Sequence, residues 1–150
     1  LYAADAVMCL EGPNGKREVP IREFITFVRR TVLQKDEIVT GIKVPYDKDL
    51  RGIFTKVARR REVDLSTICA TVARSGNEWK LAFGAVAPTP VRLPKTEELL
   101  RGKEITEALI DEAAKLARTE VSPIDDVRAS KEYRLDVVEV IVRRSLKALA

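Results

Sequence analysis

The chain contains no histidine, only two cysteines and few aromatic residues. Without histidine, Ser-His-Asp and Cys-His catalytic arrangements and HExxH zinc sites are excluded. Cys9 and Cys69 are too few for a four-ligand zinc or iron–sulfur site. No apolar run approaches the roughly 20 residues of a membrane helix, and no secretory signal is visible. We therefore expect a soluble, cytoplasmic domain with no membrane span and no metal chemistry of its own.

The charge is balanced rather than strongly basic. The 150 residues include 27 Lys+Arg and 23 Asp+Glu, giving a net charge of +4. The one dense basic run is Arg59-Arg60-Arg61, which is followed at once by Glu62 and Asp64. Nucleic-acid modules combine basic patches with stacking aromatic side chains, but aromatics are only 5% of this chain. We expect a solvated surface and no nucleic-acid partner.

The first residues predict that the chain begins directly with a strand of a sheet. The chain begins at Leu1 without methionine or a turn, and residues 6–10 form an apolar strand candidate. Residues 12–15 (GPNG) predict a hairpin turn of type I′, because Asn and Gly tolerate positive φ angles. Residues 16–21 are the predicted return strand. This start is typical of a fragment of a longer protein.

A second group of elements follows. Residues 22–30 predict a short helix or turn with Phe24, Phe27 and Val28 on an apolar side. Residues 37–44 predict a strand that Pro45 closes. The charged segment at residues 47–49 (DKD) predicts an exposed linker and a domain boundary.

Beyond the linker, three strands are predicted at residues 52–60, 66–74 and 79–87. In the first, Ile53, Thr55 and Val57 alternate with Phe54 and Lys56. Gly76-Asn77 predicts the hairpin turn between the second and third strands. The expected result is a three-stranded antiparallel meander.

From Pro94 the apolar period becomes helical. Thr96, Thr106 and Ser130 are predicted N-caps of three helices, the first ended by Gly102 and the last running to about residue 147. The β-branched stretch 137–142 favours a strand, but the length without glycine or proline favours a buried helix. Strands followed by helices predict an α+β fold, with a small antiparallel three-stranded sheet packed on a three-helix layer.

No sequence motif identifies a catalytic group. Phosphate-binding glycine motifs are absent from the sequence. The pair Glu97-Glu98 is expected in an exposed helix turn, and Asp125-Asp126 before a helix cap, where acidic residues are structural. Without histidine to activate it, Cys69 is expected to be a small buried hydrophobe.

Lys56 is the most informative single residue, because it lies in mid-strand on the side of Phe54. Its ammonium group either pairs with Asp64 or Glu62, or meets an anionic or polar ligand such as a cofactor. The ring of Tyr133 is expected to pack inside the last helix layer. The arginines of this region are expected to bind carboxylates of this chain or of a partner subunit; they are Arg128, Arg134, Arg143 and Arg144.

Four segments, in order, resemble a known family. They are residues 54–60 (FTKVARR) with 64–66 (DLS), residues 81–92 (LAFGAVAPTPVR), residues 97–103 (EELLRGK), and residues 126–130 (DVRAS) with Tyr133-Arg134 and 142–144 (VRR). They are similar to the carboxy-terminal domain of the FAD-binding medium subunit of molybdenum hydroxylases, the carbon monoxide dehydrogenase and xanthine dehydrogenase type. Residues 1–7, 19–24 and 33–39 resemble the end of the FAD-binding domain that precedes it. The implied domains are residues 1–47 and 48–150.

The resemblance implies a role in electron transfer. Lys56 matches a lysine near the isoalloxazine or ribityl part of FAD, and Val39 matches an apolar position lining the same site. The family's pyrophosphate loops lie upstream of such a stretch. The molybdenum cofactor and iron–sulfur clusters would be held by a large and a small partner subunit in a hetero-oligomer. This chain would then supply no catalytic and no metal-binding residue, and would be inactive alone.

A second hypothesis has no flavin. The chain could be an interaction module that binds an acidic protein partner through the basic turn at residues 59–61 and the helix end at Arg143-Arg144.

Overall fold

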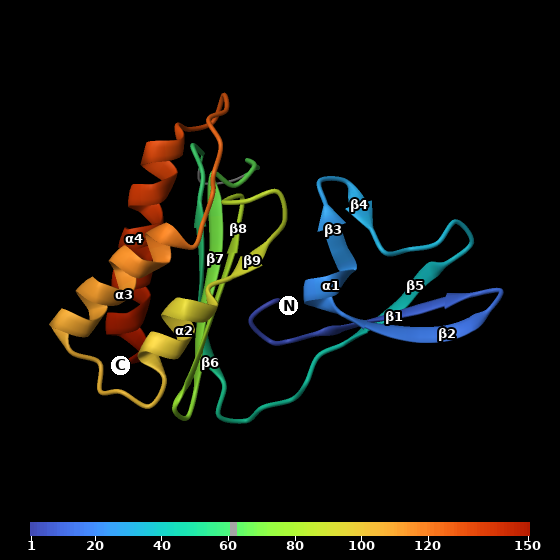
Figure 1. Cartoon of the computed structure of the whole chain (residues 1–150), viewed down its shortest axis with the longest axis horizontal. Coiled ribbons are helices and arrows are strands. Elements are labelled where there is room, and N and C mark those ends of the chain that lie inside the picture. The colour runs from blue at the N-terminus through green and yellow to red at the C-terminus, as the bar shows by residue number, and fades with distance from the viewer. Residues whose placement is uncertain (61–62) are drawn as a thin grey trace.

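The computed structural model describes residues 1–60 and 63–150. Two sheet-containing parts lie side by side, joined by the segment between β5 and β6 (Figure 1). The first part contains β1 (Val7–Gly12), β2 (Gly15–Pro20), α1 (Ile21–Phe24), β3 (Ile25–Phe27), β4 (Arg30–Thr31) and β5 (Ile38–Lys43). The second contains β6 (Arg51–Val57), β7 (Ile68–Ser75), β8 (Glu78–Gly84), β9 (Val91–Arg92), α2 (Pro94–Leu100), α3 (Glu107–Thr119) and α4 (Lys131–Leu149). The predicted α+β class is confirmed.

The first sheet has the order β2-β1-β5 and is antiparallel. The β1–β2 hairpin is confirmed, with Gly12 paired to Gly15, but its turn is not type I′. Pro13 holds its own φ near −65°, and only Gly15 in the turn has a positive φ, of 106°. One face of this sheet carries Met8, Leu10 and Val19 into a small core that also contains Phe24.

Residues 22–30 do not form one helix. Helix α1 ends at Phe24, and the chain continues as the short β3–β4 hairpin. Only Phe24 of the expected apolar side is buried, whereas Phe27 and Val28 are more than half exposed. The periodicity was misleading because Phe27 and Val28 lie at the turn of the β3–β4 hairpin, where helical spacing no longer decides which side chains are buried.

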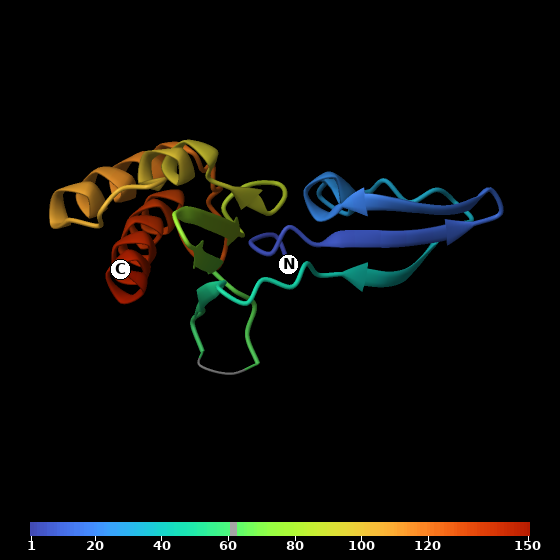
Figure 2. The ribbon, with the colours of Figure 1, turned by 90° about the horizontal axis from the view of Figure 1, so that it is seen from below.

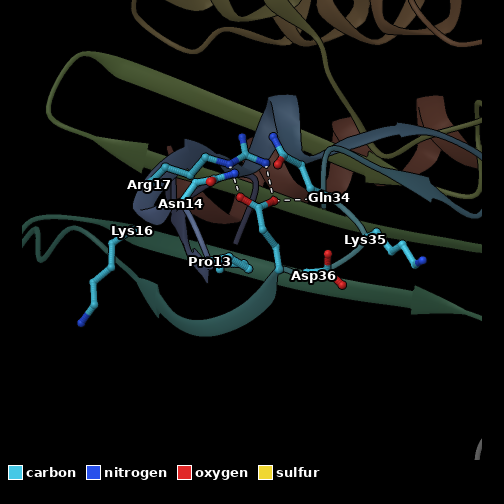
Figure 3. A pocket seen from close by; sticks show the side chains of 10 residues that line it. Pro13, Asn14, Lys16, Arg17, Gln34, Lys35 and Asp36 are labelled. Carbon is cyan, nitrogen blue, oxygen red and sulfur yellow. Dashed lines mark hydrogen bonds and ion pairs between the residues drawn. The ribbon is translucent and has the colours of Figure 1, made fainter.

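An ion pair fastens the loop before β5 to the hairpin (Figure 3). Arg17 donates to both carboxylate oxygens of Glu37, each at 2.7 Å, and to the Val32 carbonyl, also at 2.7 Å. Glu37 also accepts from the backbone N–H of Gln34 at 2.8 Å. These bonds fix the approach of the chain into β5.

The second sheet has four strands in the order β6-β7-β8-β9, all antiparallel. The three-stranded meander is confirmed, and the two-residue strand β9 is added at one edge. The prediction missed β9 because two residues carry no readable alternation. The first strand of the sheet, β6, ends at Val57 rather than at residue 60. In β6, Ile53, Thr55 and Val57 are half-buried while Phe54 and Lys56 are exposed, as the alternation indicated.

Three helices cover one face of this sheet, and the first part of the chain lies on the other side (Figures 1 and 2). The main core lies between the sheet and the helices. The predicted caps at Thr106 and Ser130 are confirmed, since each side chain accepts a backbone N–H at 3.2 Å. Residues 137–142 are helical, and Val138 and Val142 are buried in this core.

The cap predicted at Thr96 is wrong. Thr96 lies inside α2 and is fully buried. Its backbone N–H and hydroxyl both donate to Glu120, at 2.8 and 2.7 Å, and the N–H of Lys95 donates to the same carboxylate at 2.8 Å. The carboxylate that satisfies the first turn of α2 thus comes from the end of α3.

Glu37 offers a test of the loop attachment. The hydrogen bond from Arg17, aided by the Gln34 N–H, lowers the pKa of Glu37 from 4.5 to about 2. Because the folded pKa is depressed, the stabilisation is present above about pH 4.5 and is lost as the pH falls toward 2. We expect Glu37→Gln to reduce the free energy of unfolding at neutral pH, with the deficit shrinking through this window.

Urea titrations at a series of pH values measure this difference. Glu11→Gln is the matched control, because Glu11 only meets the exposed Lys16 at 3.5 Å. A Glu37→Gln deficit that is the same at every pH would contradict the assignment.

Candidate functional site

The face of the second sheet that the helices do not cover carries small side chains beside the ring of Phe54 and several cations, among them Lys56, Lys80 and Arg92. Cross-strand pairing places Lys56, Cys69 and Gly84 in one row. The next row on the same face contains Phe54, Thr71 and Ala82. Directly opposed residues share a face of an antiparallel sheet, so the register gathers these side chains from three strands.

A pocket of about 290 Å³ lies on this face. Phe54, which is 66% exposed, lines it together with the first residues of the chain. The lining residues are Leu1, Tyr2, Ala3, Phe54, Cys69, Ala70, Thr71, Ala82, Phe83, Gly84 and Pro90. The pocket is thus largely apolar, with a floor of small residues.

Lys56 adjoins this face and is held by a backbone carbonyl. Its Nζ donates to the carbonyl oxygen of Asp64 at 2.7 Å. The Asp64 carboxylate accepts from the backbone N–H groups of Arg60, at 3.0 Å, and Leu65, at 2.9 Å. The N–H of Arg60 is the main cause of the lowered pKa of Asp64. The predicted partner Asp64 therefore binds Lys56 through its backbone carbonyl and not through its carboxylate. Glu62, like Arg61 of the basic run, lies outside the described residues.

An ammonium group has three donors, so Lys56 keeps donors for a ligand. Tyr2, which lines the pocket, has a buried hydroxyl with no partner within residues 1–60 and 63–150. Burial raises the pKa of the Tyr2 hydroxyl. Lys56 does not itself line the pocket, but it lies in one cross-strand row with two residues that do, Cys69 and Gly84. An apolar pocket with a cation nearby on the same sheet face can accept a planar ring system that carries partial negative charge.

Val39 lies elsewhere. It is in β5 opposite Leu10, next to a register shift in β1, and is 39% exposed. Val39 and Lys56 therefore belong to different sheets, and Val39 does not line the pocket on the second sheet. The structure does not bring the two predicted cofactor residues into contact. Their shared role stays a prediction.

Gly84 and Cys69 meet on the pocket floor, which sequence reasoning did not anticipate. A Cβ added at Gly84 would lie 2.8 Å from the Cys69 Sγ, closer than side chains approach. Cys69 is half-buried on this outer face rather than within the core, so its predicted burial is wrong. Only the strand register reveals this contact.

Several other candidates have structural roles. Glu97 is not exposed, because Arg92 donates to both of its oxygens at 2.5 and 2.9 Å. Asp125 accepts the Lys131 N–H at 2.7 Å, as expected of an acidic residue before a helix. Tyr133 is 49% exposed and does not pack as predicted. The next residue, Arg134, lies on the buried side of α4 instead.

That residue, Arg134, is 3% exposed. It donates to the carbonyls of Thr67 at 2.5 Å and Ala85 at 2.9 Å, and to the Asp126 carboxylate at 2.8 Å. The backbone N–H of Arg128 is the main cause of an Asp126 pKa lowered to about 2, with Arg134 adding to it. Sequence reasoning foresaw a carboxylate partner but not the burial, for which the sequence carries no signal.

In the part of the chain that the structure describes, no cluster of acidic, cysteine or histidine side chains could hold a metal ion. In the same residues, no helix is both long and apolar enough to cross a bilayer.

Residues 53–149 match the family described as CO dehydrogenase flavoprotein C-terminal domain. The chain belongs to this family. Residues 1–47 match a second family, described as FAD binding domain in molybdopterin dehydrogenase. The resemblance drawn from the sequence motifs is confirmed.

Two relatives match this chain over all or nearly all of its length. The carbon monoxide dehydrogenase medium chain of Hydrogenophaga pseudoflava is 33% identical over 97% of this chain and 53% of its own. The glyceraldehyde dehydrogenase medium chain of Sulfolobus acidocaldarius is 30% identical over 100% of this chain and 55% of its own. The chain thus spans about half the length of these relatives.

Two solved structures show the same family similarity. Carbon monoxide dehydrogenase from Hydrogenophaga pseudoflava, in a form lacking the Mo-pyranopterin moiety, matches with a TM-score of 0.89 and 31% identity. That match covers 98% of this chain and 53% of the other. Quinoline 2-oxidoreductase from Pseudomonas putida 86 gives a TM-score of 0.87 at 25% identity, covering 98% and 53%.

The Gly84–Cys69 contact of this flavoprotein domain can be tested by paired substitutions. We expect Gly84→Ala to lower the free energy of unfolding by about 1–3 kcal/mol, because the new methyl group overpacks the pocket floor. Adding Cys69→Ala removes the Sγ and should restore most of the loss. Chemical denaturation measures both effects.

Gly41→Ala is the matched control, since nothing lies within 4 Å of a Cβ there. If Gly84→Ala costs the same with and without Cys69, the clash is not the cause.

Proposed function

We propose that this chain is the carboxy-terminal part of the FAD-binding subunit of a molybdenum hydroxylase-type oxidoreductase. The subunit passes electrons from iron–sulfur clusters on a small partner subunit to an acceptor. A large partner subunit carries the molybdenum cofactor, and the three form a cytoplasmic hetero-oligomer. FAD, when bound, supplies the relay between one-electron centres and the final acceptor. The role of this chain is to wall one side of the flavin.

The proposal divides the chain into residues 1–47, the end of the FAD-binding domain, and residues 48–150, the flavoprotein C-terminal domain. The ranges of the two family matches, 1–47 and 53–149, support this division. So does the segment between β5 and β6, where residues 44–49 are all exposed.

The observation that carries the proposal is the pocket on the helix-free face of the second sheet, in a chain that belongs to this family. An apolar pocket with a floor of small residues suits a flat ring system. Lys56 lies in the cross-strand row that crosses this floor. The residues present therefore fit the isoalloxazine ring of FAD.

Lys56 would act electrostatically. Its ammonium group would stabilise the negative charge that the ring system gains on reduction, with no proton transferred. Val39 would add an apolar contact to the same cofactor from the first sheet. No catalytic residue is assigned to this chain, because Lys56 and Val39 would only hold and tune the cofactor.

The flavin-free alternative has no support. Of the two arginines at the helix end, Arg143 pairs with Asp111 and Glu139 of its own chain.

The test is Lys56→Ala in the complete complex. Loss of one nearby charge, worth about 1–2 kcal/mol, should lower the flavin midpoint potential by roughly 20–45 mV for a two-electron couple. Turnover should fall as well. Spectroelectrochemistry measures the potential, and Lys56→Arg should recover most of it because the charge is kept.

Lys48→Ala is the control, since Lys48 is an exposed linker lysine. An unaltered potential and unaltered turnover in Lys56→Ala would refute the role of Lys56. Absence of flavin from the purified wild-type complex would refute the proposed function itself.

A further inference from the structure

Arg134 connects helix α4 to the end of the second sheet. The helix lies against β7 (Figure 1). The Arg134 Nη1 donates to two backbone carbonyls, those of Thr67 at 2.5 Å and Ala85 at 2.9 Å, and Nη2 donates to the Asp126 carboxylate at 2.8 Å. Thr67 lies just before β7, and Ala85 lies just after β8. One side chain of α4 therefore joins the two loops that continue these strands.

The pairing of β7 with β8 ends where Arg134 binds. The last paired residues are Cys69 and Gly84, which lie on the floor of the proposed flavin pocket. Ala85 follows with a φ of 64°, in the left-handed region that a residue with a Cβ seldom adopts. Residues held in such a conformation persist only where their surroundings fix them, and they gather at functional sites. The hydrogen bond from Arg134 holds Ala85 in place directly beside Gly84.

The same guanidinium also reaches the surroundings of Lys56. The N–H of Thr67 donates to the carbonyl of Val57 at 2.7 Å, so Thr67 is bonded to the neighbour of Lys56 in β6. In the segment that leads to Thr67, the carbonyl of Asp64 accepts from the Lys56 Nζ at 2.7 Å. The strand that carries Lys56 and the carbonyl that orients its ammonium group thus both depend on where Thr67 lies.

Burial shows that packing alone does not call for an arginine at this position. Arg134 is 3% exposed, and within residues 1–60 and 63–150 its Nε–H has no acceptor. Replacing a buried ion pair by apolar side chains is often neutral or stabilising, and Val138, one turn further along α4, is buried and apolar. A guanidinium differs from such a side chain because its rigid fork can hold several acceptors at once.

We infer that Arg134 is a positioning residue for the proposed flavin site. From the helix-covered side of the sheet it fixes Thr67 and Ala85, and through them it orients Lys56. This inference rests on the proposed function, which gives Lys56 its role at the flavin. Arg134 itself does not line the flavin pocket, so its influence passes through other residues. Supporting hydrogen bonds of this kind set how precisely a charge is aimed at a ligand.

The test is a double-mutant cycle between Arg134 and Lys56 in the complete complex, with the flavin midpoint potential as its readout. Arg134→Lys keeps the positive charge but lacks the planar fork. We expect it to lower the potential by about half as much as Lys56→Ala does, and to have almost no further effect once Lys56 is alanine. Spectroelectrochemistry of the four proteins measures this coupling.

Asp126→Asn decides the question if the Arg134→Lys protein does not fold. The amide keeps an oxygen for the backbone N–H groups that bind Asp126, but it loses the charge that holds the guanidinium. We expect a smaller shift in the same direction, which again requires Lys56.

Val142→Ala is the matched control for a general loss of stability. Val142 is a buried core residue of the same helix, so its truncation leaves a cavity without touching Thr67 or Ala85. It should lower the free energy of unfolding and leave the flavin potential unaltered.

Three results, each read in complexes that carry flavin, would overturn the inference. The first is an unaltered potential in Arg134→Lys or, where that protein does not fold, in Asp126→Asn. The second is a shift of equal size with and without Lys56, which includes the case in which Lys56→Ala has no effect. The third is the same shift in Val142→Ala. Failure of the proposed function is distinguishable, because the wild-type complex itself would then lack flavin and both proposals would fall.

Discussion

The charge cluster around Arg92 holds the two parts of the molecule together. The Arg92 side chain is only 9% exposed. Besides Glu97, it binds the Asp5 carboxylate at 2.9 Å and the Tyr2 carbonyl at 3.1 Å. Lys80 adds a contact to Asp5 at 2.7 Å. Burial would raise the pKa of Asp5, but Lys80, Arg92 and Arg22 together lower it.

The pocket on the second sheet depends on this cluster. Arg92 holds the first turn of the chain so that Ala3 packs on Ala73 and Ala82. The N-terminal residues thereby line the pocket together with Phe54. Without the cluster, the uncovered sheet face would be an open surface rather than a bounded site. The ion pairs of Asp5 with Arg92 and Lys80, where the two parts of the chain meet, thus help to shape the apolar pocket.

Local patterns predicted much of the fold, and long-range contacts account for most of the rest. Alternation in β6 correctly placed Phe54 and Lys56 together on one face of the strand, because it depends only on the strand period. The caps at Thr106 and Ser130 were predictable because each acts within three residues of itself. The cap from Glu120 and the buried Arg134 were not, since their partners come from distant segments. The same limit applies to the site, where the Cys69–Gly84 contact requires the strand register.

The separation of Asp5 and Arg92 along the chain also orders events during synthesis. These two residues are 87 positions apart. The β1–β2 hairpin pairs neighbouring segments, so it can form as soon as residue 20 has left the ribosome. Arg22, which directly follows the hairpin, lies 3.4 Å from Asp5 in the folded chain, whereas the bond from Arg92 must wait until β9 has been made. The buried part of the junction can therefore close only long after the β1–β2 hairpin is able to form.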